Sequence, residues 1–87
     1  SELKQIIDWY NDCVPGLGNQ FLENFEKQVL LITDNPKLFK IIKKGIRKTV
    51  LNRFPFVIYF RIIHNDLVRI TVIKHQRRHP NYGLNRI

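Results

Sequence analysis

Apolar residues at helical spacing dominate the first part of the chain. They recur every three or four positions and leave charged residues on the other side, as in an amphipathic helix. The members of this first stripe are Leu3, Ile6, Ile7, Tyr10 and Cys13. The proline and glycines of residues 15–18 then interrupt the pattern, because both residue types break helices. The pattern predicts a first helix that ends before Pro15.

A second helical stripe follows this break. Asn19 stands where an N-cap residue is expected. The apolar positions after it are Phe21, Leu22, Phe25, Val29 and Ile32. Asn35 precedes Pro36, and the residue before a proline is disfavoured in the α region, so the helix should end there. The two stripes together predict a helical hairpin over residues 1–35.

From Ile46 onward the hydrophobic period changes from 3.6 to 2, which is typical of strands. Three strands are predicted, at about 46–53, 55–63 and 67–76, with Asn65 and Asp66 as a two-residue hairpin turn. The lysine-rich segment at Lys43, Lys44 and Gly45 is interpreted as a solvated loop. The expected fold is therefore α+β: one domain over 1–87, with the hairpin packed on a three-stranded antiparallel meander (46–77) and a short tail (78–87).

Alternation along these strands separates two kinds of side chain. Even positions are apolar and are expected to face the helices: Ile46, Val50, Phe56, Ile58, Phe60, Ile62, Val68, Ile70 and Val72. Odd positions hold Arg47, Thr49, Arg53, Tyr59, Arg61, Arg69, Thr71, His75 and Arg77. This parity predicts one contiguous basic surface with a tyrosine set in it. A simpler interpretation is that the arginines only keep an exposed sheet face soluble.

The charge of the chain is unevenly distributed. The formal net charge is +8. Residues 1–34 hold six acids and two bases, whereas residues 35–87 hold thirteen bases and one acid, Asp66. This asymmetry indicates that the second half meets a polyanion or an acidic partner.

The candidate chemistry lies near the end of the chain. His75 and His79 flank Arg77, and imidazole beside guanidinium would suit metal-free RNA cleavage, with His moving protons and Arg stabilising charge. Asp66 is the only Asp or Glu after residue 34, so the sequence predicts no acidic residue close to these histidines along the chain. No metal site or cofactor is expected, because there is no cysteine pair and no phosphate-binding glycine loop. One cysteine and no apolar run of about 20 residues favour a cytoplasmic protein without membrane contact.

Four short motifs in order resemble the RelE/ParE superfamily of toxins. They cover nearly the whole chain, which makes the likeness more specific than any one of them. The motifs are Trp9-Tyr10 with the PGLG of residues 15–18 and Phe21, then Asn35-Pro36, then the strand RFPFVIYFR of residues 53–61, and last the HQRRHP of residues 75–80. The resemblance implies a small α+β toxin of a type II toxin–antitoxin system, neutralised by an acidic, partly helical antitoxin segment.

Two departures from the family bear on fold and activity. Members usually begin with a strand before the first helix; this chain has none there, so we expect its open sheet edge to be paired. In the RelE branch, which cleaves mRNA on the ribosome, Arg77 and Tyr82 would match catalytic positions, but Phe56 stands where a catalytic arginine is expected. The FPF strand is more similar to the ParE branch, whose members poison DNA gyrase and are not nucleases.

The sequence therefore leaves three hypotheses. The favoured one is a ParE-like toxin, with gyrase and an antitoxin as partners. The second is a RelE-like ribosome-dependent mRNA interferase, with Arg77, His75, His79 and Tyr82 as catalytic candidates. The third is an inactive toxin-fold binding module. A homodimer or an antitoxin-bridged assembly would fit the open edge. The expected residues for binding antitoxin or nucleic acid are Arg47, Arg53, Tyr59, Arg61, Arg69, His75, Arg77 and Arg78.

Overall fold

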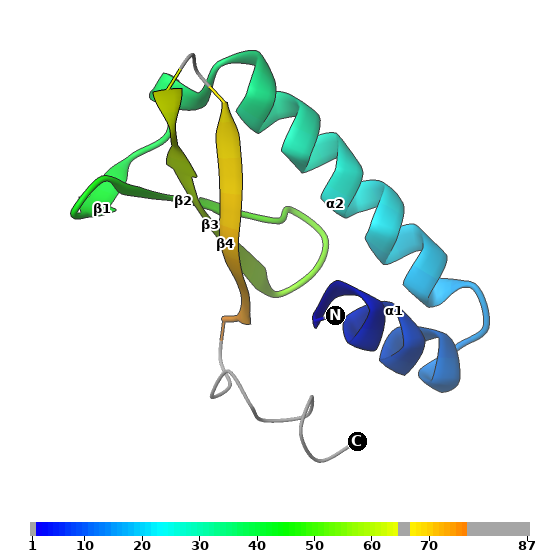
Figure 1. Ribbon diagram of the computed structural model, residues 1–87. Coiled ribbons are helices and arrows are strands. Elements are labelled where there is room, and N and C mark those ends of the chain that lie inside the picture. Colours follow the sequence, from blue (N-terminus) through cyan, green and yellow to red (C-terminus); the bar gives the residue numbers. More distant parts are fainter. Residues whose placement is uncertain (1, 65–66, 77–87) are drawn as a thin grey trace.

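A helical hairpin and one antiparallel sheet make up the structure, a computed structural model that describes residues 2–64 and 67–76 (Figure 1). The helices are α1 (Glu2–Cys13) and α2 (Leu17–Asp34), so the predicted hairpin is confirmed. After α2 the chain forms a short 3₁₀ turn, η1 (Pro36–Leu38), and then enters the sheet. Asn35 and Pro36 end α2 as the sequence predicts.

The junction between the helices depends on two glycines and one asparagine. Gly16 takes a left-handed conformation (φ 86°) and immediately precedes α2. The Gly18 N–H donates a 2.7 Å hydrogen bond to Asn11 Oδ1, which caps the new helix from α1. A side chain at Gly18 would overlap the Ile7 carbonyl oxygen, so α1 and α2 approach closely only with glycine there. The prediction of Asn19 as N-cap is wrong, because α2 begins two residues earlier and takes its cap from α1.

Among the described residues, the sheet has four strands rather than the predicted three. Their order in space follows the sequence, and all neighbours are antiparallel: β1 (Ile41–Lys43), β2 (Ile46–Val50), β3 (Phe56–Ile62) and β4 (Val68–His75). The additional strand, β1, shares only Lys43 with the segment that was interpreted as a loop, and Lys44 and Gly45 form the turn that follows it. Lys44 (φ 47°) and Gly45 (φ 79°) both have positive φ, the requirement of a tight two-residue hairpin turn. This turn returns the chain so that β1 pairs with β2.

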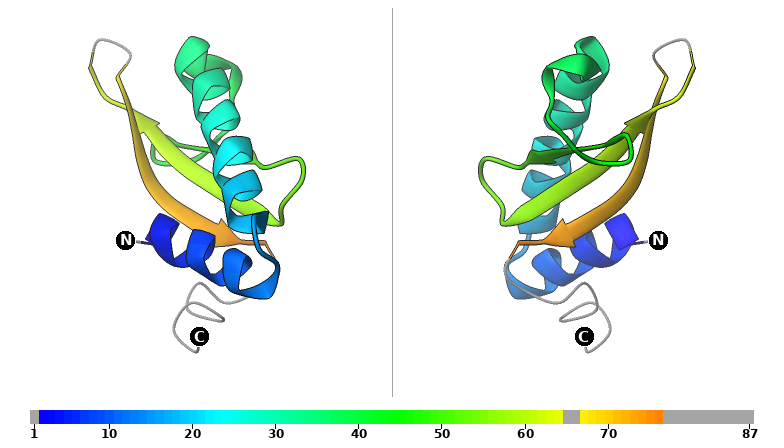
Figure 2. Two further views of the ribbon diagram at one scale, coloured as in Figure 1. Left: turned by 90° about the vertical axis from the view of Figure 1, so that its right-hand side faces the viewer. Right: turned by 90° about the vertical axis from the view of Figure 1, so that its left-hand side faces the viewer.

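One face of the sheet is covered by the helices and forms the core. Figure 2 shows α2 crossing this face, with α1 at its lower end. Phe21 of α2 packs against the aromatic rings of Phe54 and Phe56, with centroids 5.3 and 5.4 Å apart. The buried cluster as a whole comprises Ile6, Tyr10, Phe21, Phe25, Ile32, Leu51, Phe54, Phe56, Ile58, Phe60 and Ile73. In the described part of the chain, no helix covers the opposite face.

The parity predicted for β2 is wrong. Arg47 pairs with Phe60 and Thr49 with Ile58, so the odd positions of β2 share the face of the core residues. Thr49 is buried, and its hydroxyl accepts a 2.7 Å hydrogen bond from Gln28 of α2. Ile46 and Val50 therefore lie on the opposite face. A hydrogen-bonded threonine therefore lies beneath α2, where the pattern predicted an apolar side chain.

A bulge in β4 reverses the predicted parity in its second half. Tyr59 pairs with Val72 while the next residue, Phe60, pairs with Ile70, so Thr71 is an extra residue. The Thr71 hydroxyl donates a 3.1 Å hydrogen bond to the Tyr59 carbonyl. Beyond the bulge Ile73 is buried and Val72 is exposed, the opposite of the prediction.

The two edge strands of the sheet are β1 and β4. Within residues 2–64 and 67–76, no strand pairs with the outer side of β4, which is eight residues long. The expectation that this edge is covered by another chain or segment stays a prediction. The predicted turn residues Asn65 and Asp66 lie outside the described residues.

Candidate functional site: the open face of the sheet

The sheet surface opposite α2 is called the open face here. On it, the strand register aligns side chains in three rows that run across β2, β3 and β4. The rows are Ile46–Arg61–Arg69, Lys48–Tyr59–Val72 and Val50–Val57–Lys74. Each row contains at least one base and one apolar or aromatic residue. The open face therefore combines charge with surface that a partner can bury.

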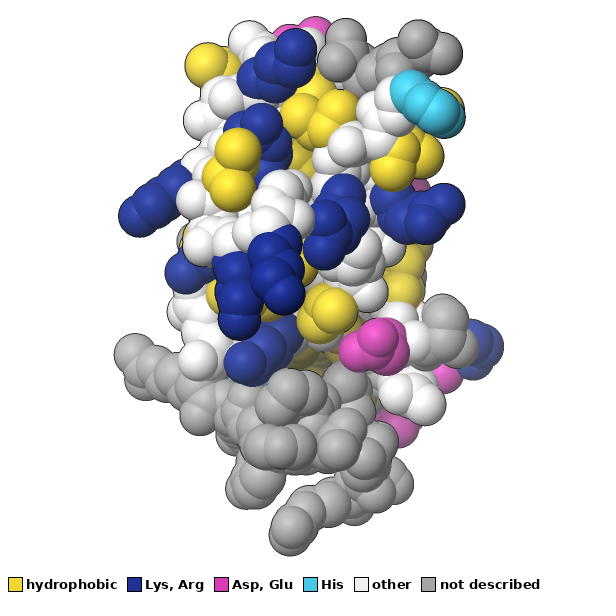
Figure 3. Space-filling model, turned by 60° about the vertical axis from the view of Figure 1, so that its left-hand side comes forward, with side chains coloured by type: hydrophobic (Ala, Val, Ile, Leu, Met, Phe, Trp, Pro, Cys, Tyr) yellow, Lys and Arg dark blue, Asp and Glu magenta, His cyan; other side chains and the backbone are white. Residues whose placement is uncertain are grey.

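Positive charge gathers on this face without compensation. Lys48, Arg61, Arg69 and Lys74 lie on it, and among the described residues no acidic side chain pairs with any of them. Figure 3 shows Lys and Arg side chains spread over this side of the molecule, with hydrophobic side chains between them. We call Lys48, Tyr59, Arg61, Arg69 and Lys74 the basic sheet face.

Two arginines stand directly opposite each other in the first row. Arg61 pairs in register with Arg69, and like charges on adjacent strands repel. The Arg61 guanidinium is held to one side, because its Nη1 donates a 2.7 Å hydrogen bond to the Lys44 carbonyl oxygen in the β1–β2 turn. Arg69 is exposed. An anion placed over this row would relieve the repulsion.

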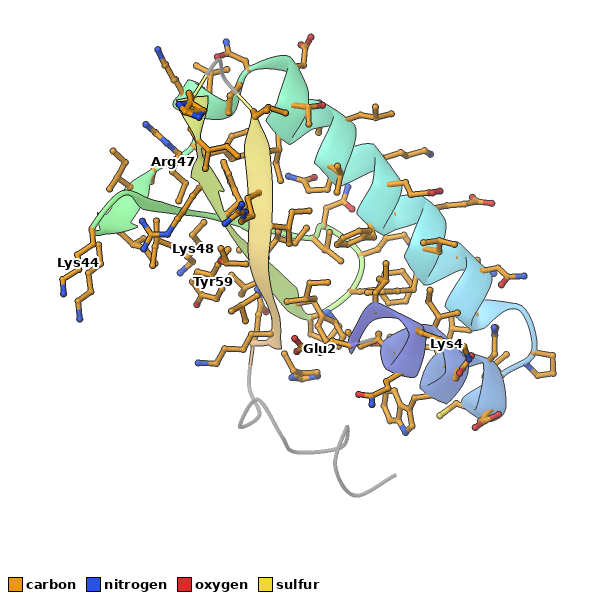
Figure 4. All side chains as sticks on the ribbon, in the orientation of Figure 1. Glu2, Lys4, Lys44, Arg47, Lys48 and Tyr59 are labelled. Carbon is orange, nitrogen blue, oxygen red and sulfur yellow. The ribbon has the colours of Figure 1, made fainter. Side chains whose placement is uncertain are left out.

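A shallow hollow of about 280 Å³ opens at the end of the face where β4 finishes. Lys48 and Tyr59 are cross-strand partners and lie close together in Figure 4. The residues that line the hollow are Lys48, Val50, Val57, Tyr59, Lys74, His75 and Gln76. It thus offers two ammonium groups, a phenol and an imidazole around a floor that includes two valines.

His75 is the only predicted catalytic residue among the described residues. It pairs in register with Phe56, and the two rings meet edge to face with centroids 5.2 Å apart. The β4 bulge turns this side chain toward the core side of the strand end, although it still borders the hollow. Its ring is therefore half-buried against an aromatic wall.

Two arginines predicted for the basic surface lie elsewhere. Arg47 pairs with Phe60 and so lies on the helix side of β2, where its Nη1 donates a 2.7 Å hydrogen bond to the Phe39 carbonyl oxygen. Arg53 lies in the β2–β3 loop and donates a 2.8 Å hydrogen bond to Gln20 Oε1 of α2. Arg53 thus ties the β2–β3 loop to α2, whereas Arg47 ties β2 to the segment that precedes β1. The prediction that they belong to one surface with Arg61 and Arg69 is wrong.

The structure brings Tyr59, Arg61 and Arg69 together as predicted, and it adds two lysines that sequence reasoning missed. Lys48 is an even position of β2, the parity that was wrongly predicted to face the helices, and the bulge that turns Lys74 outward has no signature in the sequence. The tight turn at Lys44-Gly45 could have fixed the register of β2 and so found Lys48. Four predicted site residues, Arg77, Arg78, His79 and Tyr82, lie outside the described residues.

Phe56 belongs to the core and not to the open face. It is 3% exposed and packs against Phe21 and Tyr10, with the Tyr10 ring centroid 6.3 Å away. The FPF motif therefore places an aromatic ring under the helices at the position where the nuclease branch was expected to carry an arginine. This strand contributes core packing there, and its polar groups lie further along, at Tyr59 and Arg61.

Other candidate sites are sparse in the part of the chain that the structure describes. No group of three or more His, Cys, Asp or Glu side chains forms a metal-binding cluster among these residues. Neither described helix has the length and hydrophobicity that a membrane span requires. Cys13, which was expected to be a buried apolar residue, is instead exposed at the end of α1.

A comparison with protein families identifies the family of this chain. The family described as "ParE toxin of type II toxin-antitoxin system, parDE" matches residues 1–80. The chain belongs to this ParE toxin family. It is accordingly a toxin of a type II toxin–antitoxin system, and the family implies a cognate antitoxin as partner. A comparison with curated proteins finds no match.

Proposed function

We propose that this ParE-family toxin acts in the cytoplasm by binding DNA gyrase, and that an acidic antitoxin segment neutralises it by covering the basic sheet face. Lys48, Arg61, Arg69 and Lys74 share one surface with no acidic partner among the described residues, and this observation carries the proposal. Such a field steers an acidic segment toward the face, and the apolar residues between the charges hold it once docked.

The position of Phe56 supports binding rather than catalysis. In this chain the residue is part of the core, so the strand does not present an arginine to a phosphate at that point. A binding toxin needs only the charge and the exposed apolar contacts.

The proposal is tested by inducing the toxin in bacteria and reading two signals from the same culture. Total RNA is mapped at its 5′ ends, and plasmid supercoiling is measured on gels. A gyrase-directed toxin should relax plasmids and cause DNA breaks while mRNA stays intact. Codon-phased mRNA cuts at an early time point would contradict it.

One observation favours the second candidate, an mRNA interferase. His75 borders a hollow that also holds Lys48, Lys74 and Tyr59, so an imidazole and two positive charges could meet one phosphate. In this alternative His75, His79 or Tyr82 moves protons and Arg77 stabilises charge. Replacing Arg77 and His79 by alanine should then abolish mRNA cleavage and leave antitoxin binding intact. Full cleavage by this variant would rule those roles out.

A growth assay distinguishes the third candidate, an inactive binding module, from the other two. Normal growth after induction of the folded chain, with intact mRNA and normal supercoiling, would support it.

The proposed assembly state follows from the sheet edge. If another chain pairs with β4, the complex with antitoxin should contain more than one copy of the toxin or a strand supplied by the antitoxin. Light scattering of the purified complex measures this.

A further inference from the structure

We propose that the hollow at the end of the open face is the anchor subsite of this surface, and that it takes one carboxylate side chain from an acidic helix. The inference rests on the proposed function, because the antitoxin is the partner that would supply this helix. It goes beyond that proposal by naming Lys48 and Lys74, neither of which belongs to the predicted site.

The register of the sheet places the two lysines on opposite sides of one space. Lys48 lies on β2 and Lys74 on β4, two strands and one row apart, which corresponds to about 12 Å between their Cα atoms. Tyr59 and Val57 of the central strand lie between them. Both lysines border the same hollow, so their flexible side chains can bring two ammonium groups to one anion. The Tyr59 hydroxyl adds a neutral donor.

The apolar residues around the hollow favour a peptide over a nucleic acid. Val57 and Val50 both line the hollow; Val57 is already buried at 6% exposure, whereas Val50 is 41% exposed. Val72, next to Tyr59 in the middle row, is 40% exposed. A phosphate backbone has no apolar surface with which to bury the exposed methyl groups of Val50 and Val72. An amphipathic acidic segment buries them and neutralises the lysines at the same time.

The geometry of the face also selects a helix as the occupant. Strand N–H and C=O groups bond within the plane of the sheet, so a segment lying on the face finds no backbone partners there. A helix satisfies its own backbone. Positions i, i+4 and i+8 of a helix are about 6 Å apart along its axis, close to the spacing of about 7 Å between rows. The rows thus fit an acidic, an apolar and an acidic residue at these positions, the last facing the hollow.

The test uses the full-length toxin and a synthetic helical peptide of about 18 residues with Glu, Leu and Glu at i, i+4 and i+8. Affinity is measured by fluorescence anisotropy, and the binding surface is mapped by NMR shifts of backbone amides. Lys48→Gln and Lys74→Gln should each weaken binding about tenfold or more. The matched control is Lys27→Gln on α2, which removes the same charge away from the sheet and should change nothing. Circular dichroism confirms that all variants are folded.

A double-mutant cycle identifies the carboxylate. Replacing the last glutamate of the peptide by glutamine should lower the affinity of the peptide for the wild-type toxin about tenfold. The same replacement should lower its affinity for the Lys74→Gln variant much less. Equal losses in both toxins, or amide shifts confined to the hairpin, would overturn the proposal. Tighter binding of a DNA or RNA oligonucleotide, lost in the same two variants, would assign the hollow to phosphate and overturn the carboxylate assignment.

This outcome is separable from that of the proposed function. If the antitoxin binds the purified Lys48→Gln/Lys74→Gln toxin as tightly as it binds the wild type, the anchor subsite is wrong and the toxin assignment stands. If the wild-type chain does not inhibit growth, the proposed function fails, and the peptide experiment still decides what the hollow binds.

Discussion

Alternate residues of strand β3 contribute to two very different surfaces. Ile58 and Phe60 are fully buried beneath α2, whereas Tyr59 and Arg61 on the opposite side of the strand remain half-exposed. The covered face is aromatic and aliphatic, and its few polar groups are hydrogen-bonded to loops or helices. The open face carries four bases with no acidic partner among the described residues. The covered face thus supplies the buried packing that stabilises the fold. The open face leaves charged and apolar groups exposed, which is consistent with a surface that binds a partner.

The largest expected effect breaks the covered face. Phe60→Ala should lower the free energy of unfolding by about 3–5 kcal/mol, because the ring is 0% exposed and its loss leaves a cavity. Val72→Ala, on the open face, should change it by no more than about 0.5 kcal/mol. Urea unfolding followed by circular dichroism measures both. Similar losses for the two variants would contradict the division of the sheet into a core face and an open face.

The helical layer that creates the covered face should be nearly as sensitive. Gly18→Ala is expected to cost about 2 kcal/mol or more, because the new methyl group overlaps the Ile7 carbonyl and forces α1 away from α2. Asn11→Ala removes only the cap on the Gly18 N–H and should cost about 1 kcal/mol. Thermal unfolding of the two variants shows which substitution causes the larger loss of stability. A smaller loss for Gly18→Ala than for Asn11→Ala would show that close packing of the hairpin is unimportant.

The smallest effect has the opposite sign. Arg69→Thr should raise the free energy of unfolding by about 0.2–1 kcal/mol, because it removes a like charge opposite Arg61 and introduces a good strand former. The gain should shrink in high salt, where the repulsion is screened. Chemical unfolding at two salt concentrations tests it. A clear loss of stability would mean that Arg69 has a structural role that its exposed position does not indicate.

The sequence predicts the helical layer well because its signals are local. The stripe from Leu3 to Tyr10, the break at Pro15 and the stop at Asn35-Pro36 all act within a few residues, and the helices end close to the predicted positions. The exact start of α2 was missed because its cap comes from another helix, at Asn11. The strands β3 and β4 were also found within two residues of their ends.

The composition of the open face was only partly predictable, because it depends on register between strands. Tyr59, Arg61 and Arg69 were assigned correctly to one face from simple alternation. Lys74 was missed because the β4 bulge at Thr71 shifts parity by one residue, and nothing in the local sequence requires a bulge there. Arg47 and Arg53 were misassigned because their positions depend on tertiary hydrogen bonds, to Phe39 before β1 and to Gln20 of α2, that strand alternation does not predict.

The central claim is that the open face, and not charge in general, makes this protein a toxin. It is tested most directly by comparing growth arrest by the wild type with that by two variants of equal net charge. One carries Lys48→Gln, Arg69→Gln and Lys74→Gln on the open face. The control carries Lys4→Gln, Lys27→Gln and Lys37→Gln, which lie on α1, α2 and η1. The account predicts that the control arrests growth and the open-face variant, equally folded and expressed, does not. Full arrest by the open-face variant would contradict it.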